Sequence, residues 1–219
     1  MMEKIQIYFV PGLAASEKIF ENLRFPKEKF ETNCIEWKIP TSIEESIEDY
    51  AKRMCSEIKH DNPVLVGVSF GGIMVQEMSK IINAKKVILV SSIKSNNELP
   101  TLLKVAQKTK VYKLFPAKFI ENLENYTKYF VGDFLKKRAE LYEMYLSVRD
   151  PDYLHWSIYN VLHWNQKENL ENIIHIHGTK DHIFPIKFIK GCIKIENGTH
   201  EMILTKPKII SKHIIDSLT

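Results

Sequence analysis

Five short runs of apolar, largely β-branched residues recur along the chain, and they constrain its fold more than any other feature. Continuous apolar runs of this length are typical of strands that are buried on both faces, as in a parallel sheet. The segment 33–39 is a weaker sixth candidate. The five runs are residues 5–10, 64–68, 87–90, 173–176 and 192–195.

Helical patterns lie between most of these runs. Ser42 and Glu45 have the spacing of a capping box, and apolar residues after them recur on one helix face. Further helices are expected over 73–82 and 186–190 and from Pro207 onwards. Alternating strands and helices predict an α/β fold of about six mostly parallel strands, flanked by helices with right-handed crossovers.

The alternation stops between residues 93 and 166, where only helical patterns occur. We therefore expect an α/β core formed by residues 1–92 and 167–219. A helical cap, or lid, at 93–166 would be inserted after the fourth strand. Its helices are expected over 103–114, 119–130, 134–148 and 153–162.

Aromatic residues are concentrated in this predicted cap. Aromatic side chains at helical spacing most often pack inside a protein, and that interpretation stays open here. A lid over a reactive site also needs an inner face, and an apolar one would favour acyl or aryl groups and exclude water. Trp156, Tyr159 and Trp164 are the candidate pocket residues.

Composition excludes several classes of protein. Of the 219 residues, 44% are apolar and 26% are charged, which is usual for a globular domain and not for a disordered or collagen-like chain. The net charge is +4 and the lysines are scattered, so a nucleic-acid partner is not expected. No apolar run approaches the ~18 residues of a transmembrane helix. The sequence does not indicate an oligomeric state.

Cysteine is sparse, and motifs for metals and cofactors do not occur. Cys34, Cys55 and Cys192 are odd in number and far apart, which fits neither a disulfide framework nor a CxxC site. A reducing, cytoplasmic location is therefore expected. No cluster of possible ligands has metal-site spacing and no glycine-rich phosphate loop is present, so we expect no metal and no cofactor.

The segment Gly67-Val68-Ser69-Phe70-Gly71 joins the second run to a predicted helix. A serine nucleophile must project from a sharp strand-to-helix turn, where close packing of the chain requires small residues two positions before and after it. The helix N-terminus behind Ser69 adds a field that favours negative charge. The alternative is a serine in an ordinary glycine turn, but the strand before it and the helix after it favour a nucleophile.

Two later loops carry the partners that a serine nucleophile needs, a base to take its proton and an acid to orient the base. Asp181 follows the fourth run and His200 follows the fifth. Both are therefore expected at carboxyl ends of strands, where open α/β sheets build their sites. His175 and His177 alternate along a strand and are expected to be buried and hydrogen-bonded, with no catalytic role.

Together these motifs resemble those of the α/β-hydrolase family over essentially the whole chain. The serine motif is 67–71, the acid motif 178–185 and the histidine motif 198–200, in the order Ser, Asp, His that this fold uses. Two features depart from the family pattern. The first strand corresponds to the family's third, so an antiparallel N-terminal hairpin is missing. The first loop reads Pro11-Gly12-Leu13, where relatives often carry His-Gly.

The resemblance implies an oxyanion hole made of two backbone N–H groups. One belongs to Phe70, directly after the nucleophile, and the other to Leu13, with Ala14 as the neighbouring alternative. Because backbone donors survive a change of side chain, the missing histidine does not abolish such a hole.

The sequence thus predicts a serine hydrolase that cleaves a small carboxylic ester or thioester, with an acyl or aryl group, through an acyl-enzyme on Ser69. His200 would act as base and then acid, and Asp181 would orient it. Two alternatives stay open. An acyltransferase, or a hydrolase of C–C or amide bonds, would use the same residues, whereas a non-catalytic module for binding a small molecule would need only a pocket.

Overall fold

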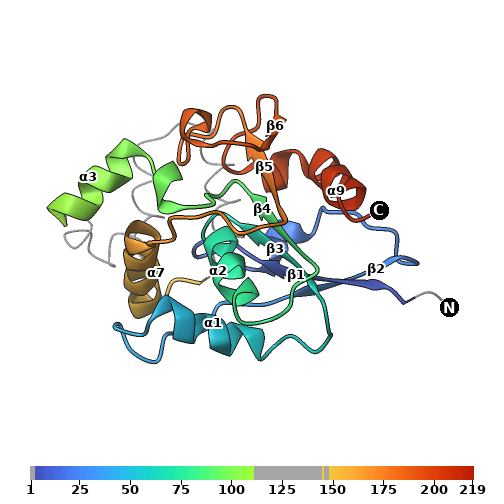
Figure 1. Ribbon diagram of the computed structural model, residues 1–219, viewed down its shortest axis with the longest axis horizontal. Helices are drawn as coiled ribbons and strands as arrows, with labels where there is room; N and C mark the ends of the chain where they lie inside the picture. Colours follow the sequence, from blue (N-terminus) through green and yellow to red (C-terminus); the bar gives the residue numbers. More distant parts are fainter. Residues whose placement is uncertain (1–2, 111–144, 146–147) are drawn as a thin grey trace.

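The computed structural model describes residues 3–110, 145 and 148–219. One sheet of six parallel strands runs through its centre in the order β2-β1-β3-β4-β5-β6 (Figure 1). This arrangement confirms the predicted α/β fold, and the described part of the chain contains no antiparallel strand. The strands are β1 (Ile5–Val10), β2 (Phe30–Cys34), β3 (Val64–Val68), β4 (Lys86–Val90), β5 (Ile173–Gly178) and β6 (Ile193–Ile195).

Helices cover both faces of the sheet (Figure 1). Strand side chains alternate between the faces, so that Tyr8 and Val10 pack on one side and Ile7 and Phe9 on the other. Burial on both faces explains why the strands read as continuous apolar runs. The first face carries α1 (Ile47–Cys55), α2 (Phe70–Ser79) and α7 (Pro151–His163), and the second η1 (Glu17–Phe20), α8 (Met202–Thr205) and α9 (Pro207–Asp216).

Between β4 and β5 the described residues form helices and no strand. These are η2 (Asn96–Glu98), α3 (Thr101–Thr109) and α7, and η4 (Ile186–Phe188) follows β5. The helix expected over 153–162 is therefore confirmed as α7. The helix expected over 119–130 lies outside the described residues, as does nearly all of the one expected over 134–148.

The edge strand β2 lies earlier in the chain than the segment 33–39 that the sequence favours. Ile35 still donates its N–H to the Phe9 carbonyl at 2.9 Å, but β1 ends just beyond, before Pro11. Ile35 and Trp37 are both buried, although the chain has left the sheet at these positions. The alternation of buried residues at these positions therefore resembles that of a strand, although no neighbouring strand remains for the segment to pair with.

Helix α1 begins at Ile47, later than the capping pattern at Ser42 indicates. Ser46 is the cap, because its hydroxyl accepts a hydrogen bond from the Asp49 N–H at 3.1 Å. The four residues 42–45 form a turn instead, and Ile43 is 53% exposed.

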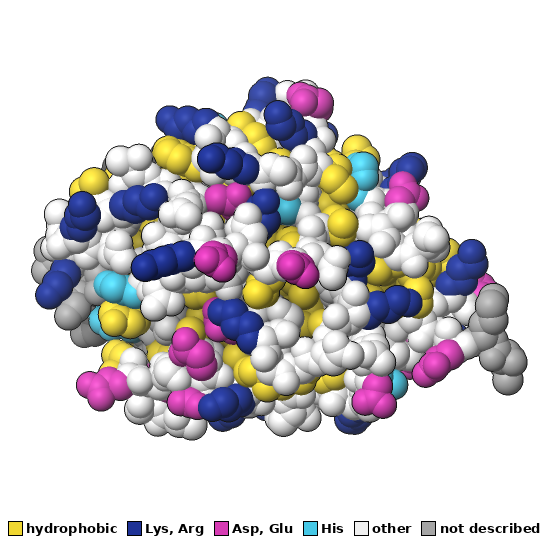
Figure 2. Space-filling model, in the orientation of Figure 1, with side chains coloured by type: hydrophobic (Ala, Val, Ile, Leu, Met, Phe, Trp, Pro, Cys, Tyr) yellow, Lys and Arg dark blue, Asp and Glu magenta, His cyan; other side chains and the backbone are white. Residues whose placement is uncertain are grey.

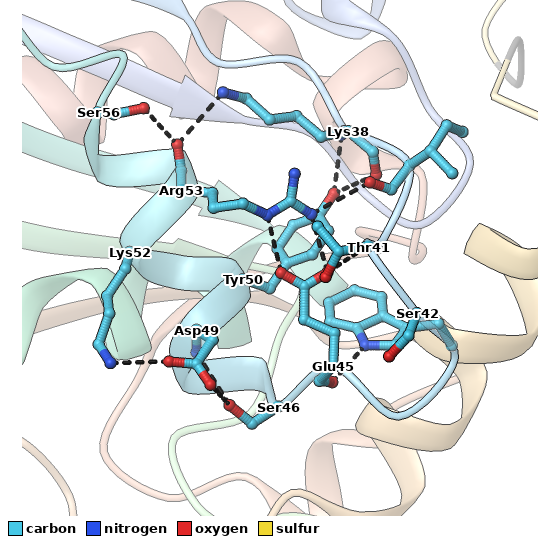
Figure 3. Close-up of polar contacts among 12 residues, drawn as sticks. Lys38, Thr41, Ser42, Glu45, Ser46, Asp49, Tyr50, Lys52, Arg53 and Ser56 are labelled. Atoms are coloured by element: carbon cyan, nitrogen blue, oxygen red, sulfur yellow. Dashed lines mark hydrogen bonds and ion pairs between the residues drawn. The ribbon is translucent and has the colours of Figure 1, made fainter.

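The Glu45 side chain explains this later start. Its carboxylate faces the Arg53 guanidinium, with Arg53 Nε 2.8 Å from Oε1, and it also accepts the Thr41 N–H (Figure 3). The pair ties the turn to the last part of α1 and lowers the pKa of the Glu45 carboxyl through the hydrogen bond from Arg53, which opposes the effect of burial.

The face of the molecule shown in Figure 2 carries basic and acidic side chains interspersed, with apolar atoms between them. Among the described residues, no helix has the length and apolar character that crossing a bilayer requires.

Candidate active site

Ser69 projects from the turn between β3 and α2. Its backbone has φ 54° and ψ −118°, a conformation that residues with side chains rarely adopt. The Ser69 N–H donates to the Val90 carbonyl at 3.0 Å. The Ser69 carbonyl accepts the Gly72 N–H at 2.9 Å and the Ser92 hydroxyl at 2.7 Å. These bonds to β4, to the residues after it and to α2 hold the strained turn in place.

Gly67 and Gly71 flank this turn because the chain passes too close there for a side chain. A Cβ at Gly67 would overlap the Gly71 carbonyl, and a Cβ at Gly71 would overlap the carbonyl oxygen of Pro11. The close approach that the sequence motif predicts is therefore present, and it presses the start of α2 against the end of β1.

His200 lies between Ser69 and Asp181. Its Nε2 is 2.9 Å from Ser69 Oγ, and its Nδ1 is 2.9 Å from Asp181 Oδ2. When Nδ1 carries the proton that it donates to Asp181, Nε2 is free to accept the proton of the Ser69 hydroxyl. The fold thus joins in one hydrogen-bonded line three side chains that lie on three separate loops.

Asp181 is held from its other side by the backbone of its own loop. Its side chain is fully buried, and Oδ1 accepts the N–H groups of Ile183 at 2.9 Å and Phe184 at 2.8 Å. These two donors fix the carboxylate so that Oδ2 faces His200. The loop also packs on the histidine loop, where the Lys180 N–H donates to the Gly198 carbonyl at 2.8 Å.

A pair of buried histidines lies behind the acid loop, at the positions where the sequence predicts buried imidazoles. His177 Nε2 is 2.8 Å from the Phe184 carbonyl oxygen and 3.5 Å from Asp181 Oδ2, and its Nδ1 is 3.2 Å from His175 Nε2. Burial lowers the pKa of His175 to about 3 and also lowers the pKa of His177. Both rings are therefore neutral at pH 7, with His177 donating to Phe184 and accepting from His175.

The loop after β1 lies beside the nucleophile. A Cβ at Gly12 would be 3.6 Å from the Cβ of Ser69. Neither the Leu13 N–H nor the Phe70 N–H donates a hydrogen bond to any of the described residues, whereas the Ala14 N–H donates to the Tyr153 hydroxyl at 3.4 Å. Of the two neighbouring candidates in this loop, Leu13 is the one whose N–H is left available.

Trp156, one of the three candidate pocket residues, lies in the core. It is fully buried, its indole N–H donates to the Glu45 carbonyl at 2.8 Å, and its ring stacks on Tyr50 at 4.1 Å between centroids. These contacts pack α7 against α1, which is the structural role that aromatic residues at helical spacing most often have.

The other two predicted pocket residues border a cavity that is separate from Ser69. Trp164 is buried and donates its indole N–H to Glu77, and Tyr159 is 47% exposed and stacks on His163. Trp164 and Tyr159 line a pocket of about 730 Å³ between α7 and residues 43–48. Ser69, Asp181 and His200 are not among its lining residues.

Three residues around the site were not predicted from the sequence: Ser92, Trp37 and Tyr153. Ser92 bonds the Ser69 carbonyl, Trp37 bonds the Gly12 carbonyl at 2.9 Å, and Tyr153 bonds the Ala14 N–H. Ser92 is the second residue after β4, and this place near a carboxyl end of a strand was the one available signal. The described residues contain no group of three or more side chains suited to hold a metal ion.

No protein-family model and no curated protein matches this chain. Solved structures do match it. A hydrolase from Pseudomonas aeruginosa PA01 has a TM-score of 0.70 at 13% identity, over 100% of this chain and 91% of that one. A thermophilic esterase from Thermogutta terrifontis has a TM-score of 0.65 at 13% identity, over 98% and 89%. An alpha/beta hydrolase fold protein from Burkholderia ambifaria has a TM-score of 0.63 at 12% identity, over 98% and 91%. With its six-stranded parallel sheet and helices on both faces, this chain has the α/β-hydrolase fold.

Proposed function

We propose that this protein is a serine hydrolase of small carboxylic esters or thioesters. The observation that carries the proposal is the hydrogen-bonded line from Ser69 through His200 to Asp181, which stands at the carboxyl ends of the strands. A pocket that only binds a ligand has no need of a base aligned on a serine hydroxyl and of a buried carboxylate aligned on that base.

In the first half-reaction Ser69 Oγ attacks the substrate carbonyl. His200 Nε2 takes the hydroxyl proton and then gives it to the leaving group, because its hydrogen bond to Asp181 holds the ring in the tautomer with Nε2 unprotonated. Asp181 stabilises the imidazolium that forms. The products are an acyl-enzyme on Ser69 and a free alcohol or thiol.

The Leu13 and Phe70 N–H groups would stabilise the oxyanion of the tetrahedral intermediate. Removing one donor from such a hole typically costs about 2.7–4 kcal/mol of transition-state stabilisation. In the second half-reaction His200 activates a water molecule, which attacks the acyl-enzyme and releases the acid. These steps are carried by side chains and backbone of this chain and call for no cofactor.

We also propose that residues 93–166 form the cap of a core made of 1–92 and 167–219. The division is supported by the described residues between β4 and β5, which form helices and no strand. Three hydrogen bonds connect the two parts. The Val148 N–H donates to the Ala14 carbonyl and the Ser16 N–H donates to the Tyr145 carbonyl, both at 3.0 Å, and the Tyr153 hydroxyl accepts the Ala14 N–H. The cap would therefore adjoin the loop beside Ser69, and an acyl or aryl group would lie between the two.

A fluorophosphonate probe and a panel of nitrophenyl esters test the proposal. Wild-type protein should be labelled at Ser69 and should hydrolyse short esters, whereas Ser69→Ala should do neither. Ser79→Ala, at the far end of α2, is the matched control and should behave as wild type. Hydrolysis that is equal in Ser69→Ala and wild type would show that the proposal is wrong. Labelling of Ser69 without ester turnover would indicate an acyltransferase or a hydrolase of C–C or amide bonds.

A further inference from the structure

We propose that Trp37 is a positioning residue of the oxyanion hole, which aims the Leu13 N–H at the reacting carbonyl. This inference rests on the proposed function. It adds a residue that lies between β2 and α1, outside every sequence motif of the site.

The first observation is a buried hydrogen bond from the indole to the loop. Trp37 Nε1 donates to the Gly12 carbonyl at 2.9 Å, and only 8% of the Trp37 side chain is exposed. The same carbonyl also accepts the Ala15 N–H at 3.0 Å. Two donors therefore fix the direction of the Gly12 carbonyl.

The second observation concerns the peptide unit that this carbonyl belongs to. Gly12 C=O and Leu13 N–H are parts of one planar peptide, and no described peptide bond is cis. In a trans peptide the C=O and the N–H point in opposite directions, so a bond that holds one also holds the other. The indole therefore sets the orientation of the Leu13 N–H without contacting the substrate.

The third observation links Trp37 to the other half of the hole. Its ring stacks on that of Phe70, with 5.0 Å between centroids and 17° between planes. Phe70 is fully buried and supplies the second N–H. One indole thus bonds the carbonyl that shares a peptide with the Leu13 N–H and also packs on the side chain of Phe70.

The substitution Trp37→Phe separates positioning from packing. It keeps an aromatic ring beside Phe70 and removes the N–H that holds the Gly12 carbonyl. Trp156→Phe is the matched control, because Trp156 belongs to the same aromatic cluster and its indole N–H also donates to a backbone carbonyl, that of Glu45, which is outside the loop. The measurements are kcat and KM on a nitrophenyl ester, the inhibition constant of a trifluoromethyl ketone, and the temperature of unfolding.

We expect Trp37→Phe to lower kcat about 10- to 100-fold with KM within about twofold, because an oxyanion forms only in the transition state. The trifluoromethyl ketone, whose adduct with Ser69 carries an oxyanion, should bind more weakly by a similar factor. Trp156→Phe should lower the unfolding temperature by a comparable amount and leave kcat within about twofold of wild type.

Unchanged kcat in Trp37→Phe, or equal losses in both variants, overturns the inference. If Trp37→Phe does not fold, β-(3-benzothienyl)alanine at position 37 has the shape of tryptophan without the N–H and gives the same comparison. Fluorophosphonate labelling of wild type distinguishes the two levels of failure. A labelled wild type with an unaffected Trp37→Phe refutes only the role of Trp37, whereas an unlabelled wild type refutes the proposed function and the role of Trp37 together.

Discussion

The two sides of the candidate site are held in place by different means. On one side, the serine turn and the acid loop are fixed by backbone contacts made within a few residues or between adjacent loops, such as Gly67 against Gly71 and the two N–H groups on Asp181. On the other side, residues 11–16 are fixed by partners far away in the sequence, which include the Trp37 indole and the Tyr153 hydroxyl. The first kind of support leaves a motif in the sequence and the second does not.

The difference also predicts how each side tolerates change. Backbone packed on backbone cannot give way to an added methyl group, whereas a loop held by several separate hydrogen bonds can keep its path when one of them is lost. Substitutions in the serine turn should therefore affect folding, and substitutions around residues 11–16 should affect mainly the rate of reaction.

The largest effect is expected from Gly67→Ala. The added Cβ would overlap the Gly71 carbonyl, so the variant should lose more than about 3 kcal/mol of unfolding free energy or fail to fold. Gly12→Ala is the matched control, because its Cβ would make an ordinary 3.6 Å contact with the Cβ of Ser69 and should change stability by less than about 1 kcal/mol. Urea denaturation measures both, and equal losses would remove the distinction between the two sides.

Next in size is the effect of Asp181→Asn on catalysis. The amide nitrogen facing His200 Nδ1 would favour the tautomer with Nε2 protonated, which cannot take the Ser69 proton, so kcat should fall by about 10³- to 10⁴-fold. Asp152→Asn, in the first turn of α7, serves as the control and should leave kcat unchanged. A fall of less than tenfold in Asp181→Asn would show that the line from Ser69 to Asp181 does not work as proposed.

A third prediction uses pH to destabilise the region behind the acid loop, where His175 is buried. His175 binds a proton near pH 6.5 when unfolded but only near pH 3 when folded, since burial lowers its pKa. The unfolded state therefore binds more protons in this window, and the unfolding free energy should fall as pH drops below about 6.5, by up to about 1.4 kcal/mol per pH unit.

Residues 11–16 contain no titratable side chain, so this loop contributes nothing of its own to the loss. Urea denaturation at pH 7 and pH 5 should show a smaller difference for His175→Gln than for wild type. The same pH slope in both proteins would mean that His175 is not the group responsible.

The smallest effect is expected from Tyr153→Phe. Its hydroxyl accepts the Ala14 N–H at the long distance of 3.4 Å, so its loss should change stability by about 1 kcal/mol or less and kcat by less than about threefold. Steady-state kinetics of Tyr153→Phe and Trp37→Phe, measured side by side, would test whether Tyr153→Phe has the smaller effect on kcat. A larger loss in Tyr153→Phe would show that the loop is held mainly through α7 and not through Trp37.

The sequence predicted the parallel sheet, and it indicated Ser69, Asp181 and His200 as candidate catalytic residues. Both predictions were possible because buried strands and tight turns impose local patterns on a sequence. It misplaced β2, since Ile35 and Trp37 are buried for a reason other than strand pairing. It named Trp156 as a candidate pocket residue and left packing open, because a periodic aromatic pattern is the same for a helix face that lines a cavity and one that packs on α1. In both cases the side chains have partners that lie far away along the chain.

The bonds from Tyr145, Val148 and Tyr153 to the loop after β1 have a consequence for any attempt to change what this protein accepts. The groups at Tyr145, Val148 and Tyr153 that bond Ala14 and Ser16 lie in the same segment that would shape the substrate pocket. Under the proposed function, a change in this segment made to alter selectivity would therefore also alter turnover. A segment transplanted from another protein would retain turnover only if it reproduced these three anchoring bonds.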